Sequence, residues 1–152
     1  MNTKSWIILT LLFLGITGII YYSFNNNNDI PTGAADLPAG PIHWHPHLII
    51  KINGQEQVIP ANIGLGQVHA PTHTHAPDGI IHLENNKPTT KTLKLGYFFD
   101  VWGKTFSNEC ILDHCTDKGT LKMFVNGNEN LDFENYLLRD KDEILIEYTT
   151  NK

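Results

Sequence analysis

Histidine is concentrated in one part of this chain, in a pattern that favours metal binding. The chain contains 8 histidines, and all but His114 lie between residues 43 and 82. They form two clusters, residues 43–47 (HWHPH) and residues 69–82, which include HTH at residues 73–75. Neutral imidazole is the commonest metal ligand among side chains and suits Zn, Cu, Ni and Fe. Such a density of imidazoles predicts a transition-metal site.

The spacing of the clustered histidines indicates how they could share an ion. In an extended segment successive side chains point to opposite faces, so His-x-His places both rings on one side. We therefore predict that the clusters converge, with three principal ligands: His45, His73 and His75. Four more histidines are candidate ligands: His82, His43, His47 and His69. Because these candidates exceed one tetrahedral site, either two sites exist or some histidines support the ligands.

The available ligand types narrow the choice of metal to Cu(II) or Zn(II), since imidazole ligation without thiolate suits both ions. With only 2 methionines, the chain does not resemble a Met-rich Cu(I) carrier. The N-terminal segment, discussed below, is expected to place the domain on the oxidising side of a membrane, and that location favours copper over zinc.

Asp78 and Glu84 could be carboxylate ligands, partners that orient imidazoles, a general base toward metal-bound water, or simple surface acids. Two interpretations without metal stay open: a pH-responsive surface and a polar network linking loop to sheet.

The two cysteines, Cys110 and Cys115, are separated by four residues. We predict that they form a disulfide, because the chain is expected to lie on the side of the membrane where disulfides persist. The competing interpretation is a soft metal or redox site made by both thiolates and His114. If the disulfide forms, the cysteines are not ligands.

The N-terminal segment predicts a membrane anchor. Residues 6–24 contain no charged side chain, and about 20 apolar residues suffice to cross a bilayer. We predict an anchor over residues 1–24, with a cleaved signal peptide as the alternative. Lys4 and the amino terminus favour an N-terminus inside and a C-terminal domain outside the cytoplasm. Residues 25–41 predict a flexible linker, and residues 42–152 a single domain.

The charge balance of the predicted outer part argues against some partners. After Lys4 is set aside, 10 of the 11 Lys and Arg residues remain against 16 Asp and Glu residues, a balance of −6. Nucleic acid and anionic lipid headgroups are therefore unsuitable partners. Contact with membrane lipid is expected only through the N-terminal helix.

Alternating patterns predict most of the domain to be β-structure. Two extended runs flank Asn53-Gly54, a pair that suits a type I′ turn, and predict a hairpin over residues 47–60. Further strands are predicted at residues 79–84, 121–125 and 143–148. Between the hairpin and the next strand, residues 61–77 predict a long loop.

One short helix is expected among these strands. Leu95, Phe98, Phe99 and Trp102 recur at helical spacing, and Gly103 can end the helix. These side chains are expected to face the core. The predicted fold class is α+β and β-rich: a single transmembrane helix followed by a small mixed-sheet domain.

Two segments near the C-terminus carry a resemblance to the β-grasp, or ubiquitin-like, arrangement. These are FVNGNE at residues 124–129 and LRDKDEILI at residues 138–146, and the resemblance covers residues 93–150. It implies a hairpin, a helix and a returning pair of strands.

A more specific resemblance rests on four motifs. They are HTHxxDGIIHLE at residues 73–84, YFFDVWG at residues 97–103, Cx4C, and RDKDEI at residues 139–144. Together they resemble an uncharacterised family of membrane-anchored or secreted prokaryotic His-rich domains. The resemblance implies a location outside the cytoplasm.

No recognisable enzyme motif accompanies the histidines. The chain has neither H-E-x-x-H nor G-x-S-x-G, the spacings of zincin proteases and α/β-hydrolases. We therefore expect a membrane-anchored, extracytoplasmic domain that binds a transition metal for delivery or storage. The alternatives are an accessory subunit of a membrane complex, such as a copper-dependent oxidase or monooxygenase, and a metal-dependent hydrolase that uses Glu84 or Asp78.

Overall fold

The computed structural model describes residues 37–151, in which two β-sheets and a short helix enclose one core. The predicted anchor, residues 1–24, and the linker as far as residue 36 lie outside the described residues. Leu37, which we assigned to the linker, is partly buried against the core, and the unit that contains it begins at this residue. Within the described part of the chain, no helix has the length and apolarity needed to span a bilayer.

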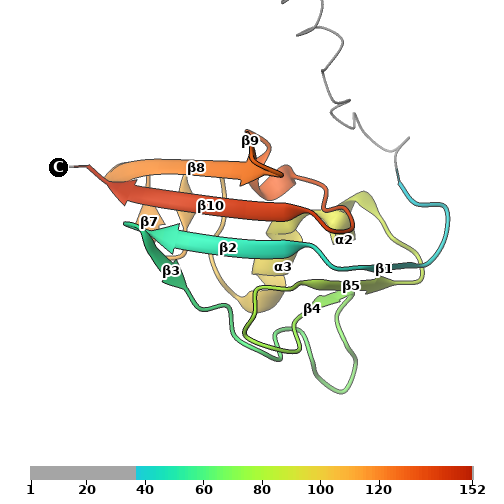
Figure 1. Cartoon of the computed structure of the whole chain (residues 1–152). Coiled ribbons are helices and arrows are strands. Elements are labelled where there is room, and N and C mark those ends of the chain that lie inside the picture. The colour runs from blue at the N-terminus through green and yellow to red at the C-terminus, as the bar shows by residue number, and fades with distance from the viewer. Residues whose placement is uncertain (1–36, 152) are drawn as a thin grey trace, which may run out of the picture. The chain divides into compact units, whose positions relative to one another are not determined.

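The larger sheet has five strands and mixes parallel with antiparallel pairing. Its spatial order is β3 (Gln55–Gln57), β2 (His47–Ile52), β10 (Glu143–Thr150), β8 (Gly119–Val125) and β9 (Asn128–Glu129). β2 and β10 run parallel at the centre, with Ile146 opposite Ile50, and the outer pairs are antiparallel (Figure 1). Buried residues alternate along β2, β8 and β10, because alternate side chains of a strand face the core.

Two Asn-Gly pairs turn the chain at the ends of the long strands. Asn53 and Gly54 connect β2 to β3, and Asn126 and Gly127 connect β8 to β9. All four residues have positive φ, between 51° and 80°, as a type I′ turn requires. The hairpin predicted over residues 47–60 is therefore present.

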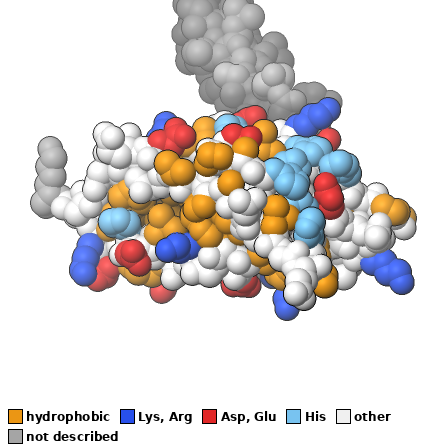
Figure 2. Space-filling view, turned by 90° about the horizontal axis from the view of Figure 1, so that it is seen from below, with side chains coloured by type: hydrophobic (Ala, Val, Ile, Leu, Met, Phe, Trp, Pro, Cys, Tyr) orange, Lys and Arg blue, Asp and Glu red, His pale blue; other side chains and the backbone are white. Residues whose placement is uncertain are grey.

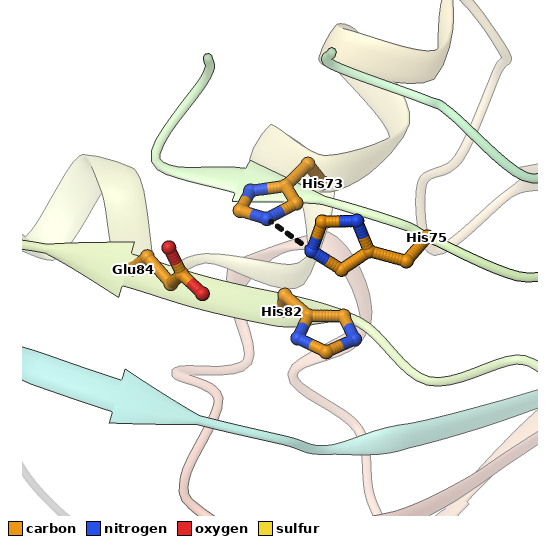
Figure 3. Close-up of side chains that lie close together, drawn as sticks. All are labelled: His73, His75, His82 and Glu84. Atoms are coloured by element: carbon orange, nitrogen blue, oxygen red, sulfur yellow. Dashed lines mark hydrogen bonds between the residues drawn. The ribbon is translucent and has the colours of Figure 1, made fainter.

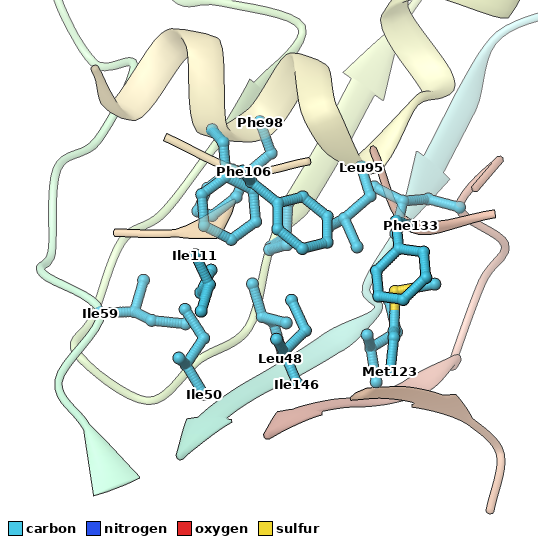
Figure 4. Packing of buried hydrophobic residues seen from close by; sticks show 14 of the residues in the cluster. Leu48, Ile50, Ile59, Leu95, Phe98, Phe106, Ile111, Met123, Phe133 and Ile146 are labelled. Atoms are coloured by element: carbon cyan, nitrogen blue, oxygen red, sulfur yellow. The ribbon is translucent and has the colours of Figure 1, made fainter. Parts of the chain in front are cut away.

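The helix α3 (Leu95–Trp102) covers the inner face of the larger sheet. Leu95, Phe98 and Phe99 are buried on it. Figure 4 shows Leu95 and Phe98 above the side chains of Leu48 and Ile50 of β2 and Ile146 of β10. Trp102 is partly buried against the same core. Gly103 ends the helix in the left-handed conformation, with φ 70°, where a residue without Cβ carries no steric cost. The predicted helix and its C-terminal glycine are confirmed.

The smaller sheet has three short antiparallel strands and lies beside the start of β2 (Figure 1). Its central strand is β5 (His82–Asn85), flanked by β1 (Ile42–Trp44) and β4 (Thr72–His73). The strand predicted at residues 79–84 begins later than expected, because Ile80 makes only an isolated bridge to His47. The long predicted loop is also interrupted, since β4 lies inside it.

A small disulfide-linked hairpin completes the domain. β6 (Cys110–Ile111) and β7 (His114–Cys115) pair antiparallel, and Cys110 and Cys115 are bonded. The predicted disulfide is present, so the alternative of a thiolate metal site no longer applies. Two short helical segments are also present: α2 (Thr90–Leu93) directly precedes α3, and η2 (Phe133–Asn135) lies between β9 and β10 in the sequence.

The predicted fold class holds at a coarse level: the domain is β-rich, has a mixed sheet and contains few helices. The sequence patterns did not predict β1, β4 or β9. Each of these strands has only two or three residues, too few to show an alternating pattern.

Candidate metal centre

Three neighbouring strands of the smaller sheet each present two ligand-type side chains, two residues apart. The pairs are His43 and His45, His82 and Glu84, and His73 and His75. His43 pairs with Glu84, and His73 pairs with His82. One step beyond β1 the same register brings His45 beside His82, with ring centroids 4.8 Å apart. Paired residues of an antiparallel sheet share a face, so all six side chains gather on one side.

Four of these side chains form what we call the inner group: His73, His75, His82 and Glu84. Their potential ligand atoms all lie within 4.8 Å of one another, and Figure 3 shows the rings and the carboxylate turned toward a common space. The Nε2 atoms of His73 and His75 are 3.2 Å apart. Two ligands held at 2.0–2.1 Å by a tetrahedral ion are separated by about 3.3 Å. The inner group therefore fits a transition-metal ion without a large rearrangement.

The backbone orients His73 within the inner group. Its Nδ1 lies 3.2 Å from the carbonyl oxygen of Ala70, which can only accept a hydrogen bond, so Nδ1 carries the proton and donates. The lone pair of His73 is then on Nε2, the nitrogen that faces His75. A histidine ligand is typically fixed in this way, with its second nitrogen bonded to a carbonyl or carboxylate.

Thr74 fixes the strand that carries both of these histidines. It lies between His73 and His75, points to the opposite face and is fully buried. Its hydroxyl donates to the carbonyl of Pro60 at 2.7 Å and accepts from the amide of Ile63 at 3.1 Å. Backbone hydrogen bonds link Thr74 to Ile63 and Asn62 as well. The predicted loop over residues 61–77 is therefore held by contacts within the protein.

Burial lowers the pKa of two of the inner imidazoles and so favours the neutral form that metals require. Desolvation lowers the pKa of His73, while the Ala70 carbonyl and Glu84 act in the opposite direction. Desolvation also lowers the pKa of His82, and the neighbouring imidazoles of His75 and His45 lower it further. The Nδ1 atom of His82 is buried without a hydrogen-bond partner. An unsatisfied buried nitrogen carries a free-energy cost that coordination to an ion would remove.

A second cluster, which we call the outer group, consists of His43, His45 and His82. Its ligand atoms also lie within 4.8 Å of one another, and the rings of His43 and His45 are 4.7 Å apart. The Nε2 atom of His43 lies 3.1 Å from a carboxylate oxygen of Glu84. Figure 2 shows histidine side chains gathered in one surface patch with acidic side chains beside it. His82 belongs to both groups, and Glu84 contacts both.

The structure brings the two sequence clusters together but divides the predicted ligands between the groups. His73 and His75, two of the three principal candidates, lie in the inner group, whereas the third, His45, lies in the outer group. His82 and His43 join these groups as well.

The remaining two candidates, His47 and His69, belong to neither group. Nδ1 of His47 lies 2.9 Å from a carboxylate oxygen of Glu143, and the two residues are register partners of the central strands. His69 is exposed, with its ring 5.8 Å from that of His73. His47 therefore has a contact that ties β2 to β10.

Two other residues considered from the sequence also lie outside the groups. The carboxylate of Asp78 accepts a hydrogen bond from the amide of Ile80 at 3.0 Å and stabilises the turn before β5. His114 packs its ring against Tyr148, with centroids 5.0 Å apart. Neither residue is close enough to the histidine groups to serve as a ligand within them.

Comparison with known proteins found no matching family model, no matching curated protein and no matching solved structure. The function of this chain must therefore be inferred from the geometry of the site.

Sequence reasoning overlooked two features of the site. One is the carbonyl of Ala70, which no side-chain pattern could reveal. The other is the central position of His82 and Glu84, whose His-x-Glu spacing repeats the alternation of the two His-x-His pairs. That repeated spacing was the available pattern, since three short strands with the same alternation can present one ligand face.

Proposed function

We propose that this chain is a transition-metal-binding domain, with the inner group as its principal site. The supporting observation is that three imidazoles and one carboxylate converge within 4.8 Å on the paired strands β4 and β5 and the residues that follow β4. His73 and His75 supply two Nε2 ligands, and His82 and Glu84 complete a four-ligand set. Such a set of nitrogen and oxygen donors suits a borderline divalent ion.

Cu(II) is the proposed ion, and Zn(II) is its competitor. Divalent copper lies at the top of the affinity order for sites with nitrogen and oxygen ligands. The cysteines of the described domain are joined in a disulfide, so no thiolate is present to favour Cu(I). A disulfide also suits an oxidising compartment, where copper is found in its divalent state.

We propose further that the domain is held outside the cytoplasm by the apolar N-terminal segment and handles metal there, for delivery or storage. The apolar run over residues 6–24 supports this location, as does the disulfide. The larger sheet has the order β3-β2-β10-β8-β9, and its first and last strands in the sequence, β2 and β10, are parallel at its centre, with α3 on one face. This arrangement supports classification as a β-grasp-like fold. The proposed kinship with membrane-anchored or secreted His-rich domains agrees with this location.

The position of Glu84 argues against the hydrolase alternative. A general base must be free to take a proton from metal-bound water. Glu84 instead lies within ligand distance of the inner imidazoles and contacts His43. Its carboxylate is better placed as a ligand.

Metal binding and thermal unfolding of the purified full-length chain test the proposal. We expect one equivalent of Cu(II) or Zn(II) to bind. At a hundredfold excess over Kd the ion should stabilise the folded state by about 2.7 kcal/mol and raise Tm. At the same metal concentration His73→Ala/His75→Ala should lose this shift. The shift should also fade below about pH 6, because protonated imidazole cannot coordinate.

A matched control removes two imidazoles outside both groups. His69→Ala/His114→Ala should keep the full metal-dependent shift in Tm. If the wild-type chain shows no shift with any divalent first-row metal, the proposal fails. The histidines would then be a polar network that supports a protein contact, and an accessory subunit of a membrane complex would become the better hypothesis.

A further inference from the structure

A continuous row of imidazoles joins the outer group to the inner group. Neighbouring imidazoles follow one another from β1 to β4, with ring centroids 4.7 Å apart for His43 and His45 and 4.8 Å for His45 and His82. The row continues from His82 to His75 at 4.5 Å and from His75 to His73 at 4.8 Å. Each of these distances between ring centroids is close to the spacing of adjacent strands, about 4.8 Å.

The two ends of this row differ in exposure. The side chain of His43 is 64% exposed, and His45 is exposed too. His73, at the other end, is only 1% exposed. In the inner group His75 and Glu84 are exposed as well. An ion arriving from solution or from a partner can reach the outer group directly, whereas an ion in the inner group is shielded on the side of His73.

Shared residues make simultaneous occupancy of the two groups unfavourable. His82 is a member of both groups. Among the described residues, Glu84 supplies the only carboxylate that is itself a member of a group, while that of Asp140 accepts a hydrogen bond from the amide of His45 at 3.0 Å. Two divalent ions a few ångströms apart repel each other strongly, and these few negative charges offset little of that repulsion. The two groups are thus suited to hold a single ion, which occupies one group at a time.

We propose that the outer group is a loading site, through which a divalent transition-metal ion enters and leaves the inner group by ligand exchange. This inference rests on the proposed metal-binding function. His82 keeps its bond to the ion, while the bonds from His43 and His45 break and those from His73 and His75 form. The ion keeps its oxidation state. The proton on Nε2 of His75 passes through solvent to Nδ1 of the same exposed ring, so no net proton is released in the exchange.

Rapid-mixing measurements of Cu(II) loading, and of its removal by EDTA, test the loading site in the full-length chain. Tryptophan fluorescence provides the readout, since Cu(II) quenches it and Trp44 lies between His43 and His45. We expect His43→Ala/His45→Ala to leave the stoichiometry at one ion and Kd within about twofold of wild type. The rates of loading and of release should both fall, by about tenfold or more, because an unchanged Kd requires equal changes in both. The control His69→Ala/His114→Ala should load and release at wild-type rates.

A second experiment measures equilibrium Cu(II) binding by the outer group after two ligands of the inner group have been removed. His73→Ala/His75→Ala should still bind one Cu(II) at higher metal concentrations, at least about a thousandfold more weakly than wild type, since fewer ligands remain. Adding His43→Ala to that variant should abolish this weaker binding.

Three results would overturn the loading site. They are two ions bound at once by wild type, unchanged rates in His43→Ala/His45→Ala, and no residual binding by His73→Ala/His75→Ala. These results differ from failure of the proposed function, in which wild type binds no ion at all.

Discussion

The two sheets of this domain are built on different principles. The three central strands of the five-stranded sheet are long, with 6 residues in β2, 7 in β8 and 8 in β10, and alternate residues along them are buried. In the three-stranded sheet β1, β4 and β5 have only 3, 2 and 4 residues. One face of the smaller sheet carries imidazoles and a carboxylate, while the other contributes Leu83 and Thr72 to the interior.

This difference assigns the stability of the domain mainly to the larger sheet and the proposed metal binding to the smaller sheet. The larger sheet derives its stability from apolar burial, which does not depend on a ligand. The smaller sheet also contributes Ile42 and Leu83 to the core. Its other face gathers imidazoles that resist protonation when close together, so an ion that binds them stabilises that region in particular. Substitutions in one sheet should therefore leave the property of the other largely intact, which three further experiments examine.

The largest effect is expected from Ile146→Ala, in the centre of the larger sheet. Ile146 is 0% exposed, and removing a buried side chain of this kind costs about 2–5 kcal/mol of unfolding free energy. Urea denaturation should show this loss, while the affinity of the folded protein for Cu(II) stays unchanged.

Leu145→Ala is the matched control for that substitution. Leu145 is the next residue of the same strand and faces the other side, where it is only half-buried. We expect a clearly smaller loss of stability. Weaker Cu(II) affinity in folded Ile146→Ala protein would show that the two sheets are not separable.

A smaller effect is expected from Gly64→Ala, in the loop that covers β4. Gly64 has φ +71°, and an added Cβ would lie 2.6 Å from the carbonyl oxygen of Thr72 and 2.9 Å from Val101. The strained backbone and the displaced strand should together cost about 1–3 kcal/mol. Because Thr72 precedes His73, Cu(II) affinity should fall even though no ligand has changed.

Gly54→Ala separates backbone strain from steric displacement. Gly54 has φ +78°, but an added Cβ would meet nothing within 4 Å, and the residue lies in the turn of the larger sheet. The Gly54→Ala substitution should lower the free energy of unfolding through backbone strain alone and leave Cu(II) affinity unchanged. Equal losses of affinity in the two variants would contradict the role assigned to the loop.

The smallest effect is the pH dependence of the metal-free protein. Burial lowers the pKa of His73 and His82 in the folded state, whereas the unfolded imidazoles titrate near pH 6.5. Below that pH the unfolded state binds more protons than the folded state. This part of the stability is therefore complete above about pH 6.5 and is lost as pH falls through the lower folded-state pKa values.

Urea midpoints measured in EDTA between pH 8 and 5 check this dependence. The variant His73→Gln/His82→Gln should have a flatter profile than wild type, whatever its absolute stability. A wild-type profile as flat as that of the variant would show that these imidazoles lose no solvation on folding.

Local rules accounted for the features that depend on local sequence. The spacing of Leu95, Phe98 and Phe99 predicted α3, and Gly103 predicted its end, because helical periodicity lies within a few residues. Asn53-Gly54 predicted the first hairpin, since few other pairs adopt two positive φ values without strain. The alternation of Ile144, Ile146 and Tyr148 likewise predicted the buried face of β10.

By itself, then, the sequence determined that histidines alternate along extended segments and that a helix and the Asn53-Gly54 hairpin shape the core. Only the tertiary structure decided which histidines meet. His45 is distant in the chain from His73 and His82, and the three become neighbours because β5 pairs with both β1 and β4. The strands β1 and β4 are too short to be predicted from their pattern. Tertiary contacts likewise placed His47 beside Glu143 and outside both groups. Which side chains share an ion depends on strand register, and register is set by pairing between strands that are remote in the sequence.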